Sequence, residues 1–193
     1  AAVMTSDGGF RTGDVGRFDE SDFLLITGRI KERYKLQNGK YVVPSHVENL
    51  IELSPYVTVC MLYGENREYN VCLISVNLEH VMAYAHKAGI PTSKHEHITD
   101  EEIDALLRHK GVLEHFQNII GETTKGCRNF QKPVKFRLIA DEWSPGTGMT
   151  TQTFKLKRVQ VISKYADLID QMYFEDEEQH QSDDDDVPLR NSG

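Results

Sequence analysis

Lys155 is the residue of this 193-residue chain whose surroundings most suggest chemistry. It follows a flexible stretch at residues 145–148 (Pro-Gly-Thr-Gly), and it lies among threonines and two further cations, Lys157 and Arg158. An ammonium on a mobile loop can contact a phosphate and a carboxylate together. The residues alone favour the plainer interpretation, a surface lysine beside the basic start of a helix.

Asp14 is a second candidate, because it ends a turn formed by Thr12 and Gly13 and precedes a predicted strand. A carboxylate held at such a turn can accept two hydrogen bonds from a vicinal diol such as a ribose. The alternative is an aspartate that only stabilises its own turn, which is the usual role of this residue type there.

The elements that must position these residues follow from turn signals and from apolar periodicity. Three antiparallel pairs are predicted: residues 15–18 with 23–27, residues 34–36 with 41–43 around an Asn-Gly turn, and residues 57–63 with 70–76. A further strand is predicted at 133–139, and helices at 45–53, 78–88, 99–109, 112–120 and 159–173. Ser45 with Glu48 and Thr99 with Glu102 have the spacing of capping boxes. The order predicts an α+β fold of short antiparallel sheets flanked by helices.

Composition excludes several classes of protein. The chain is 39% hydrophobic and 27% charged, which is typical of a globular protein and not of a disordered or collagenous one. It has no uninterrupted run of about eighteen apolar residues, so no membrane span is predicted. Its first residues do not resemble a secretory signal.

The net charge of −8 is concentrated near the C-terminal end. Residues 175–186 hold eight of the 30 acids and no Lys or Arg, which leaves 22 acids against 22 bases elsewhere. We expect residues 175–193 to form a disordered acidic tail. A neutral body lacks the clustered cations that non-specific nucleic-acid binding requires, so no nucleic-acid partner is expected.

The three cysteines, Cys60, Cys72 and Cys127, form no Cys-x-x-Cys pair. Their odd number indicates buried or free thiols in a reducing, intracellular compartment. Cys60 and Cys72, in two neighbouring predicted strands, are interpreted as apolar filler. His95 and His97 lie in a polar connection and are interpreted as part of a solvated linker. No metal site is expected in this chain.

Four ordered motifs are more specific than any single residue. They are residues 10–14 (Phe-Arg-Thr-Gly-Asp), 28–32 (Gly-Arg-Ile-Lys-Glu), 37–44 (Gln-Asn-Gly-Lys-Tyr-Val-Val-Pro) with Val47 and Glu48, and 151–158 (Thr-Gln-Thr-Phe-Lys-Leu-Lys-Arg). Together they resemble adenylate-forming enzymes, and within them long-chain fatty acyl-CoA synthetases. The resemblance extends to about Tyr173 and includes the helical insertion near 79–129.

The resemblance implies a two-step reaction with ATP, Mg²⁺ and coenzyme A. A fatty acid and ATP would give an acyl-adenylate and pyrophosphate, and the thiol of coenzyme A would then displace AMP. Lys155 would be the catalytic lysine of adenylation. Asp14 would bind the ribose hydroxyls and Arg29 the nucleotide. Lys31 would be the hinge, and Gly39 would line the coenzyme A tunnel.

The resemblance also implies the domain organisation. Residues 1–30 would end a large adenylate-forming domain, and residues 31–174 would form a C-terminal lid that contacts the N-terminal domain of the same protein. Gln152 stands where this family usually has proline. The Gly-rich phosphate loop and the aromatic-Gly-x-Thr-Glu motif of the family are missing, so we expect this piece alone to be inactive.

Two other interpretations stay open. One is a ligase for another carboxylate, such as a medium-chain or aromatic acid. The other is a non-enzymatic α+β interaction module whose acidic tail recruits a basic partner. Neither the organelle nor the oligomeric state follows from the sequence, and peripheral association with an intracellular membrane is compatible with it.

Overall fold

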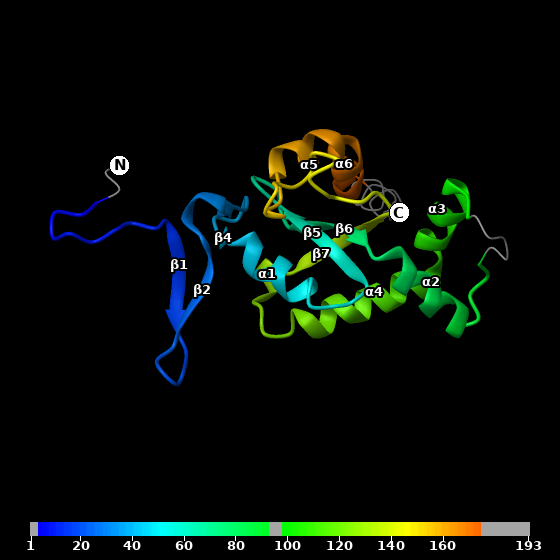
Figure 1. Ribbon diagram of the computed structural model, residues 1–193, viewed down its shortest axis with the longest axis horizontal. Helices are drawn as coiled ribbons and strands as arrows, with labels where there is room; N and C mark the ends of the chain where they lie inside the picture. Colours follow the sequence, from blue (N-terminus) through cyan, green and yellow to red (C-terminus); the bar gives the residue numbers. More distant parts are fainter. Residues whose placement is uncertain (1–3, 93–97, 175–193) are drawn as a thin grey trace, which may run out of the picture. The chain divides into compact units, whose positions relative to one another are not determined.

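The computed structural model describes residues 4–92 and 98–174. It divides into two compact units, Ala1–Trp143 and Ser144–Gly193, and each unit is described by itself. Helices and small sheets make it an α+β protein, as the sequence predicts (Figure 1). His95, His97 and the acidic residues from 175 onward lie outside the described residues. Within the described ranges, no helix combines the length and the apolar character needed to cross a membrane.

The first unit begins with the predicted hairpin. β1 (Asp14–Phe18) pairs antiparallel with β2 (Leu24–Arg29). The Asp19 carboxylate closes the turn by accepting hydrogen bonds from the amides of Ser21 and Phe23, each at 2.9 Å. Several large apolar side chains of this hairpin are exposed: Phe18, Phe23, Leu24 and Ile26.

A short 3₁₀ segment, η1 (Ile30–Glu32), leads into a second hairpin of β3 (Tyr34–Lys35) and β4 (Tyr41–Val42). The amide of Gly39 donates to the carbonyl of Leu36 at 2.9 Å, and the Leu36 amide donates to the Lys40 carbonyl at 2.9 Å. This is a three-residue loop with glycine at its left-handed position.

The main sheet has three strands in the order β5 (Val57–Tyr63), β6 (Asn70–Val76) and β7 (Pro133–Ile139). β5 and β6 are antiparallel, as predicted. β7 joins β6 in parallel, a pairing that hairpin signals cannot reveal because the two strands are far apart in sequence. All seven residues of the central strand β6 are buried, which explains its nearly continuous apolar sequence.

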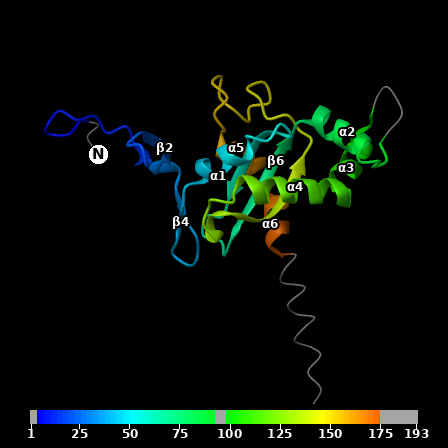
Figure 2. The same ribbon diagram turned by 90° about the horizontal axis from the view of Figure 1, so that it is seen from below.

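Helices α1 (Pro44–Ile51) and α4 (Lys110–Thr123) lie on the same face of this sheet (Figure 2). With α2 (Leu78–Lys87) and α3 (Asp100–Arg108) they contribute to one apolar core. Buried members of that core from helices and strands include Val47, Ile51, Cys60, Leu62, Cys72, Ile74, Val81, Leu107 and Phe116. The predicted capping box of Thr99 and Glu102 is present at the start of α3.

The predicted capping box of Ser45 and Glu48 is wrong. Helix α1 begins at Pro44 without a side-chain cap, and the Ser45 hydroxyl has no hydrogen-bond partner among the described residues. The Glu48 carboxylate instead accepts from the amide of Leu62 at 2.6 Å, in β5. β5 is an edge strand of the sheet, so its outward amides need acceptors, and the buried carboxylate supplies one.

We predict that Glu48→Ala destabilises the first unit by about 1–3 kcal/mol, because it removes the acceptor of a buried amide. Glu48→Gln keeps a side-chain oxygen and should lose much less. Urea unfolding followed by circular dichroism measures both changes. Equal stability of the wild type and the alanine variant would show that this carboxylate does not hold the sheet edge.

The three cysteines are free and buried, which agrees with the interpretation of Cys60 and Cys72 as apolar filler. A hydrogen bond with Cys72, together with burial, raises the pKa of the Cys60 thiol well above its usual value. Burial also raises the pKa of Cys127. The thiols of Cys60 and Cys127 therefore stay in the unreactive protonated form.

An aromatic cluster joins α4 to α2 and to Tyr56, which directly precedes β5. The His115 ring stacks on Tyr84 of α2 with centroids 3.9 Å apart, and it meets Tyr56 edge-on at 4.5 Å. Among the described residues, the buried Nε2 of His115 has no hydrogen-bond partner. Burial lowers the pKa of His115, because the charged imidazolium would lose hydration there.

We predict that the folded first unit loses stability as the pH falls below about 6.5, the ordinary pKa of histidine. Since the folded state binds the His115 proton less readily than the unfolded state, His115 favours folding fully above that pH and progressively less below it. Denaturant unfolding at several pH values tests this. His115→Phe keeps the ring stack and should reduce the change in the free energy of unfolding between pH 7 and 5. If the free energy of unfolding changes with pH as it does in the wild type, His115 is not the cause of that change.

A short 3₁₀ turn, η2 (Asn129–Gln131), precedes β7 in the first unit. The second unit contains α5 (Arg158–Lys164) and α6 (Ala166–Phe174). The prediction of one continuous helix over 159–173 is wrong, because the chain leaves helical geometry at Tyr165, with φ −112° and ψ 23°. Periodicity could not reveal this break, since buried residues keep helical spacing on both sides of it.

Candidate functional site

The structure brings Asp14 and Arg29 together. They are cross-strand partners in the first hairpin, and Arg29 Nε lies 3.1 Å from Asp14 Oδ1. The Asp14 amide donates to the hydroxyl of Thr12 at 3.1 Å, so the turn fixes the backbone below the carboxylate. The Asp14 side chain is 24% exposed and that of Arg29 55%, which leaves the pair open to a polar ligand. Sequence reasoning treated the two residues separately; only the strand register reveals the pair.

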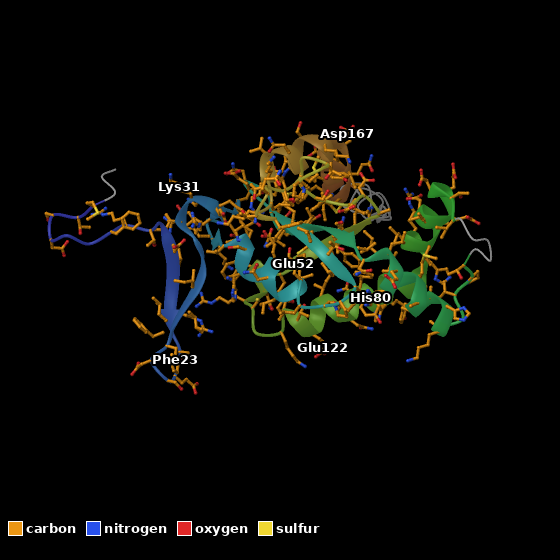
Figure 3. All side chains as sticks on the ribbon, in the orientation of Figure 1. Phe23, Lys31, Glu52, His80, Glu122 and Asp167 are labelled. Atoms are coloured by element: carbon orange, nitrogen blue, oxygen red, sulfur yellow. The ribbon has the colours of Figure 1, made fainter. Side chains whose placement is uncertain are left out.

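Lys31 lies immediately after this pair, in η1, where no residue is buried. The flanking residues Arg29 and Arg33 are both extended, with ψ near 139° and 140°. Figure 3 shows Lys31 at one end of the β1–β2 hairpin and Phe23 at the opposite, turn end. A three-residue helical turn without buried side chains restrains the backbone only weakly.

Gly39 occupies the left-handed position of the β3–β4 loop, with φ +84°. A Cβ placed there would meet only Lys35 Cε, at 3.7 Å. The backbone conformation, and not crowding, therefore requires glycine at this position. The loop tip is exposed, so a larger side chain would project outward from it.

The second hairpin is basic. The guanidinium of Arg33 lies 4.9 Å from the ring centre of Tyr41, and the Lys40 ammonium lies 5.0 Å from that of Phe130. In the parts of the chain that the structure covers, no carboxylate pairs with Arg33, Lys35 or Lys40. Within the described residues, these three cations near Gly39 are therefore not held in ion pairs.

Lys155 lies in the second unit, in a turn with a well-defined hydrogen-bond pattern. The Thr151 amide donates to the Lys155 carbonyl at 2.8 Å, and the Lys155 amide donates to the Thr151 hydroxyl at 3.1 Å. The hydroxyls of Thr151 and Thr153 lie 3.0 Å apart, and Thr150 forms a bridge with Leu156. The Lys155 side chain is exposed, and its ammonium has no partner among residues 4–92 and 98–174. The backbone is held while the cation stays available.

Four of the five predicted site residues, Asp14, Arg29, Lys31 and Gly39, thus belong to the first unit, and Lys155 belongs to the second. Within the described residues, no group of three or more His, Cys, Asp or Glu side chains could hold a metal ion. Sequence reasoning also passed over Phe154, whose left-handed backbone gives no signal in the sequence.

Residues 31–177 match the family model described as the AMP-binding enzyme C-terminal domain. Among curated proteins, the chain is similar to long chain acyl-CoA synthetase 8 of Arabidopsis thaliana, with 30% identity over 85% of this chain and 22% of the relative. It is also similar to the long-chain-fatty-acid–CoA ligase ACSBG2 of Gallus gallus, with 31% identity over 89% of this chain and 24% of the relative. The chain therefore spans about a quarter of the length of these relatives.

Solved structures agree on the fold. The adenylation domain of a carboxylate reductase from Mycobacterium chelonae superposes with a TM-score of 0.64 at 24% identity, covering 89% of this chain and 24% of that chain. The A-PCP didomain of a carboxylic acid reductase from Segniliparus rugosus, solved with AMP, gives a TM-score of 0.65 at 22% identity, covering 93% of this chain and 22% of that chain.

Proposed function

The chain belongs to the family of AMP-binding enzyme C-terminal domains, and from that premise we propose that it is the C-terminal part of an ATP-dependent long-chain fatty acid–CoA ligase. The observation that carries the proposal is the available Lys155 ammonium on a hydrogen-bonded turn, within a motif that resembles the corresponding motif of such ligases. The curated relatives, which are named as acyl-CoA synthetases and fatty-acid–CoA ligases, support the long-chain substrate.

The proposed reaction has two steps. A carboxylate oxygen of the fatty acid attacks the α-phosphorus of ATP, the bond to the β-phosphate oxygen breaks, and pyrophosphate leaves. The sulfur of coenzyme A then attacks the acyl carbon, the thiol proton is lost to solvent or a base, and AMP leaves.

Lys155 acts in the first step. Negative charge gathers on the oxygens around the α-phosphorus during the attack, and a positioned ammonium between phosphate and carboxylate stabilises that arrangement more than the ground state. Asp14 accepts hydrogen bonds from the ribose hydroxyls, and Arg29, which pairs with it at 3.1 Å, contacts the nucleotide beside it. Mg²⁺ would accompany the ATP phosphates, and we place its ligands outside this chain.

Lys31 is the proposed hinge between the two steps. Residues 1–30 belong to the large domain, residues 31–174 form the lid, and the start of the family match at residue 31 supports that boundary. Rotation at η1 withdraws Lys155 and brings Gly39 to the pantetheine tunnel, where the absence of a side chain leaves room for the thiol-bearing arm. The lid partners the N-terminal domain of the same protein, in an intracellular location that allows peripheral contact with a membrane.

The test is acid-dependent pyrophosphate release by the full-length protein. Long-chain, medium-chain and aromatic acids are compared at equal concentration, with ATP and Mg²⁺ but without coenzyme A. We expect the fastest pyrophosphate release with long-chain acids. A preference for aromatic or medium-chain acids would overturn the substrate assignment, and no release with any acid would favour the interaction module.

A further inference from the structure

Phe154, directly before Lys155, combines two unfavourable features. Its φ is +58°, a left-handed conformation that costs a residue with a Cβ and a bulky ring more than it costs glycine. Its side chain is 69% exposed, so burial does not repay that cost. Neither backbone geometry nor packing among the described residues accounts for phenylalanine here.

The chain contains its own comparison. In the β3–β4 loop the Gly39 amide donates to the carbonyl three residues earlier, and the Leu36 amide donates to the Lys40 carbonyl. In the Lys155 turn the Phe154 amide donates to the Thr151 carbonyl at 2.9 Å, and Thr151 donates to Lys155 in the same way. Phe154 thus occupies the position that Gly39 holds in the other loop, and each is followed by lysine.

One loop uses the residue that fits this backbone without strain, whereas the other keeps an aromatic ring in spite of it. Strain of this kind persists where the side chain has a function. The chain spans about a quarter of the length of its curated relatives, 22% and 24% for two of them. In a protein of that length, most of the surface that could receive the Phe154 ring would belong to the other parts of the protein.

We propose that Phe154 is a positioning residue for adenylation. The proposal rests on the function proposed above. When the lid is in the adenylation orientation, the Phe154 ring packs against an apolar surface of the nucleotide-binding domain of the same protein. That contact fixes the turn, so that the neighbouring ammonium of Lys155 reaches the phosphate and the carboxylate. In the thioester-forming orientation the ring is released and has no effect.

Three substitutions in the full-length protein separate the ring from the backbone. Phe154→Gly and Phe154→Asn remove the ring and relieve the left-handed backbone strain. Phe154→Tyr keeps both the aromatic ring and the strain. Val159→Ala is the control for loss of an exposed apolar side chain in the same unit, since Val159 is 75% exposed. Each variant is measured for acyl-adenylate formation, for thioester formation from supplied acyl-adenylate, and for melting temperature.

We expect Phe154→Gly and Phe154→Asn to lower kcat of adenylation about tenfold or more with an unchanged KM for ATP, because misplacement of a reacting group acts on kcat. Thioester formation should be unchanged, the melting temperature should not fall, and Phe154→Tyr and Val159→Ala should behave like the wild type. Full adenylation by Phe154→Gly, in a protein that Lys155→Ala inactivates, would overturn this inference alone. Normal adenylation by Lys155→Ala would overturn the proposed function and this inference with it.

Discussion

Lys155→Ala should abolish acyl-adenylate formation by the full-length protein, while thioester formation from supplied acyl-adenylate continues at nearly the wild-type rate. Loss of one donor that stabilises developing charge costs about 10²- to 10³-fold in rate, and in the proposed mechanism the lysine faces the reaction centre in only one lid orientation. Pyrophosphate release reports the first step, and release of AMP on addition of coenzyme A reports the second.

Two further variants sharpen this result. Lys155→Arg keeps the charge but replaces a compact ammonium by a planar guanidinium, so we expect only partial recovery. Lys157→Ala removes a cation two residues away and should keep adenylation, because its backbone hydrogen bond to Met149 survives the change. Equal losses in Lys155→Ala and Lys157→Ala would mean that general positive charge matters, and not one positioned ammonium.

Gly39→Leu should have the opposite effect. A leucine at the exposed loop tip would project into the proposed pantetheine tunnel and slow thioester formation by about 10²-fold, the scale expected from misplacing a reacting group by about 1 Å. Adenylation should continue, because the proposed mechanism places Gly39 away from the reaction centre in the adenylation orientation. Single-turnover measurement with preformed acyl-adenylate and coenzyme A gives the rate directly.

Gly39→Ala is the matched control. Alanine is strained in the left-handed backbone conformation, at φ +84°, to a similar degree as leucine, but it adds only a methyl group. If the alanine variant loses thioester formation as severely as the leucine variant, the effect comes from backbone strain, and the tunnel assignment of Gly39 is wrong.

Local signals in the sequence predicted the hairpins well. The antiparallel pairing of β5 with β6 and the capping box at Thr99 depend on residues close in sequence, and both are confirmed. Local signals gave a wrong prediction for Glu48. Its spacing from Ser45 fits a capping box, but the buried edge of β5 offers a stronger interaction, and that edge is visible only once the strands are placed.

The candidate site was predictable in part. Motif order identified Asp14, Arg29, Lys31, Gly39 and Lys155 as residues to examine. It could not reveal that Asp14 and Arg29 form an ion pair, because the pair depends on hairpin register. It could not reveal the left-handed Phe154 either, since a phenylalanine in sequence carries no sign of its φ angle. The parallel addition of β7 to the sheet was hidden for a similar reason, the long separation between β6 and β7.

In the proposed mechanism one lid serves two reactions in two orientations, with Lys155 facing the reaction centre in the first and Gly39 in the second. Rapid-quench measurement of both steps for Lys155→Ala and Gly39→Leu, side by side in the full-length protein, tests it most directly. We predict opposite losses: the first variant fails only in adenylation and the second only in thioester formation. Loss of the same step in both variants would contradict a lid that alternates between two orientations.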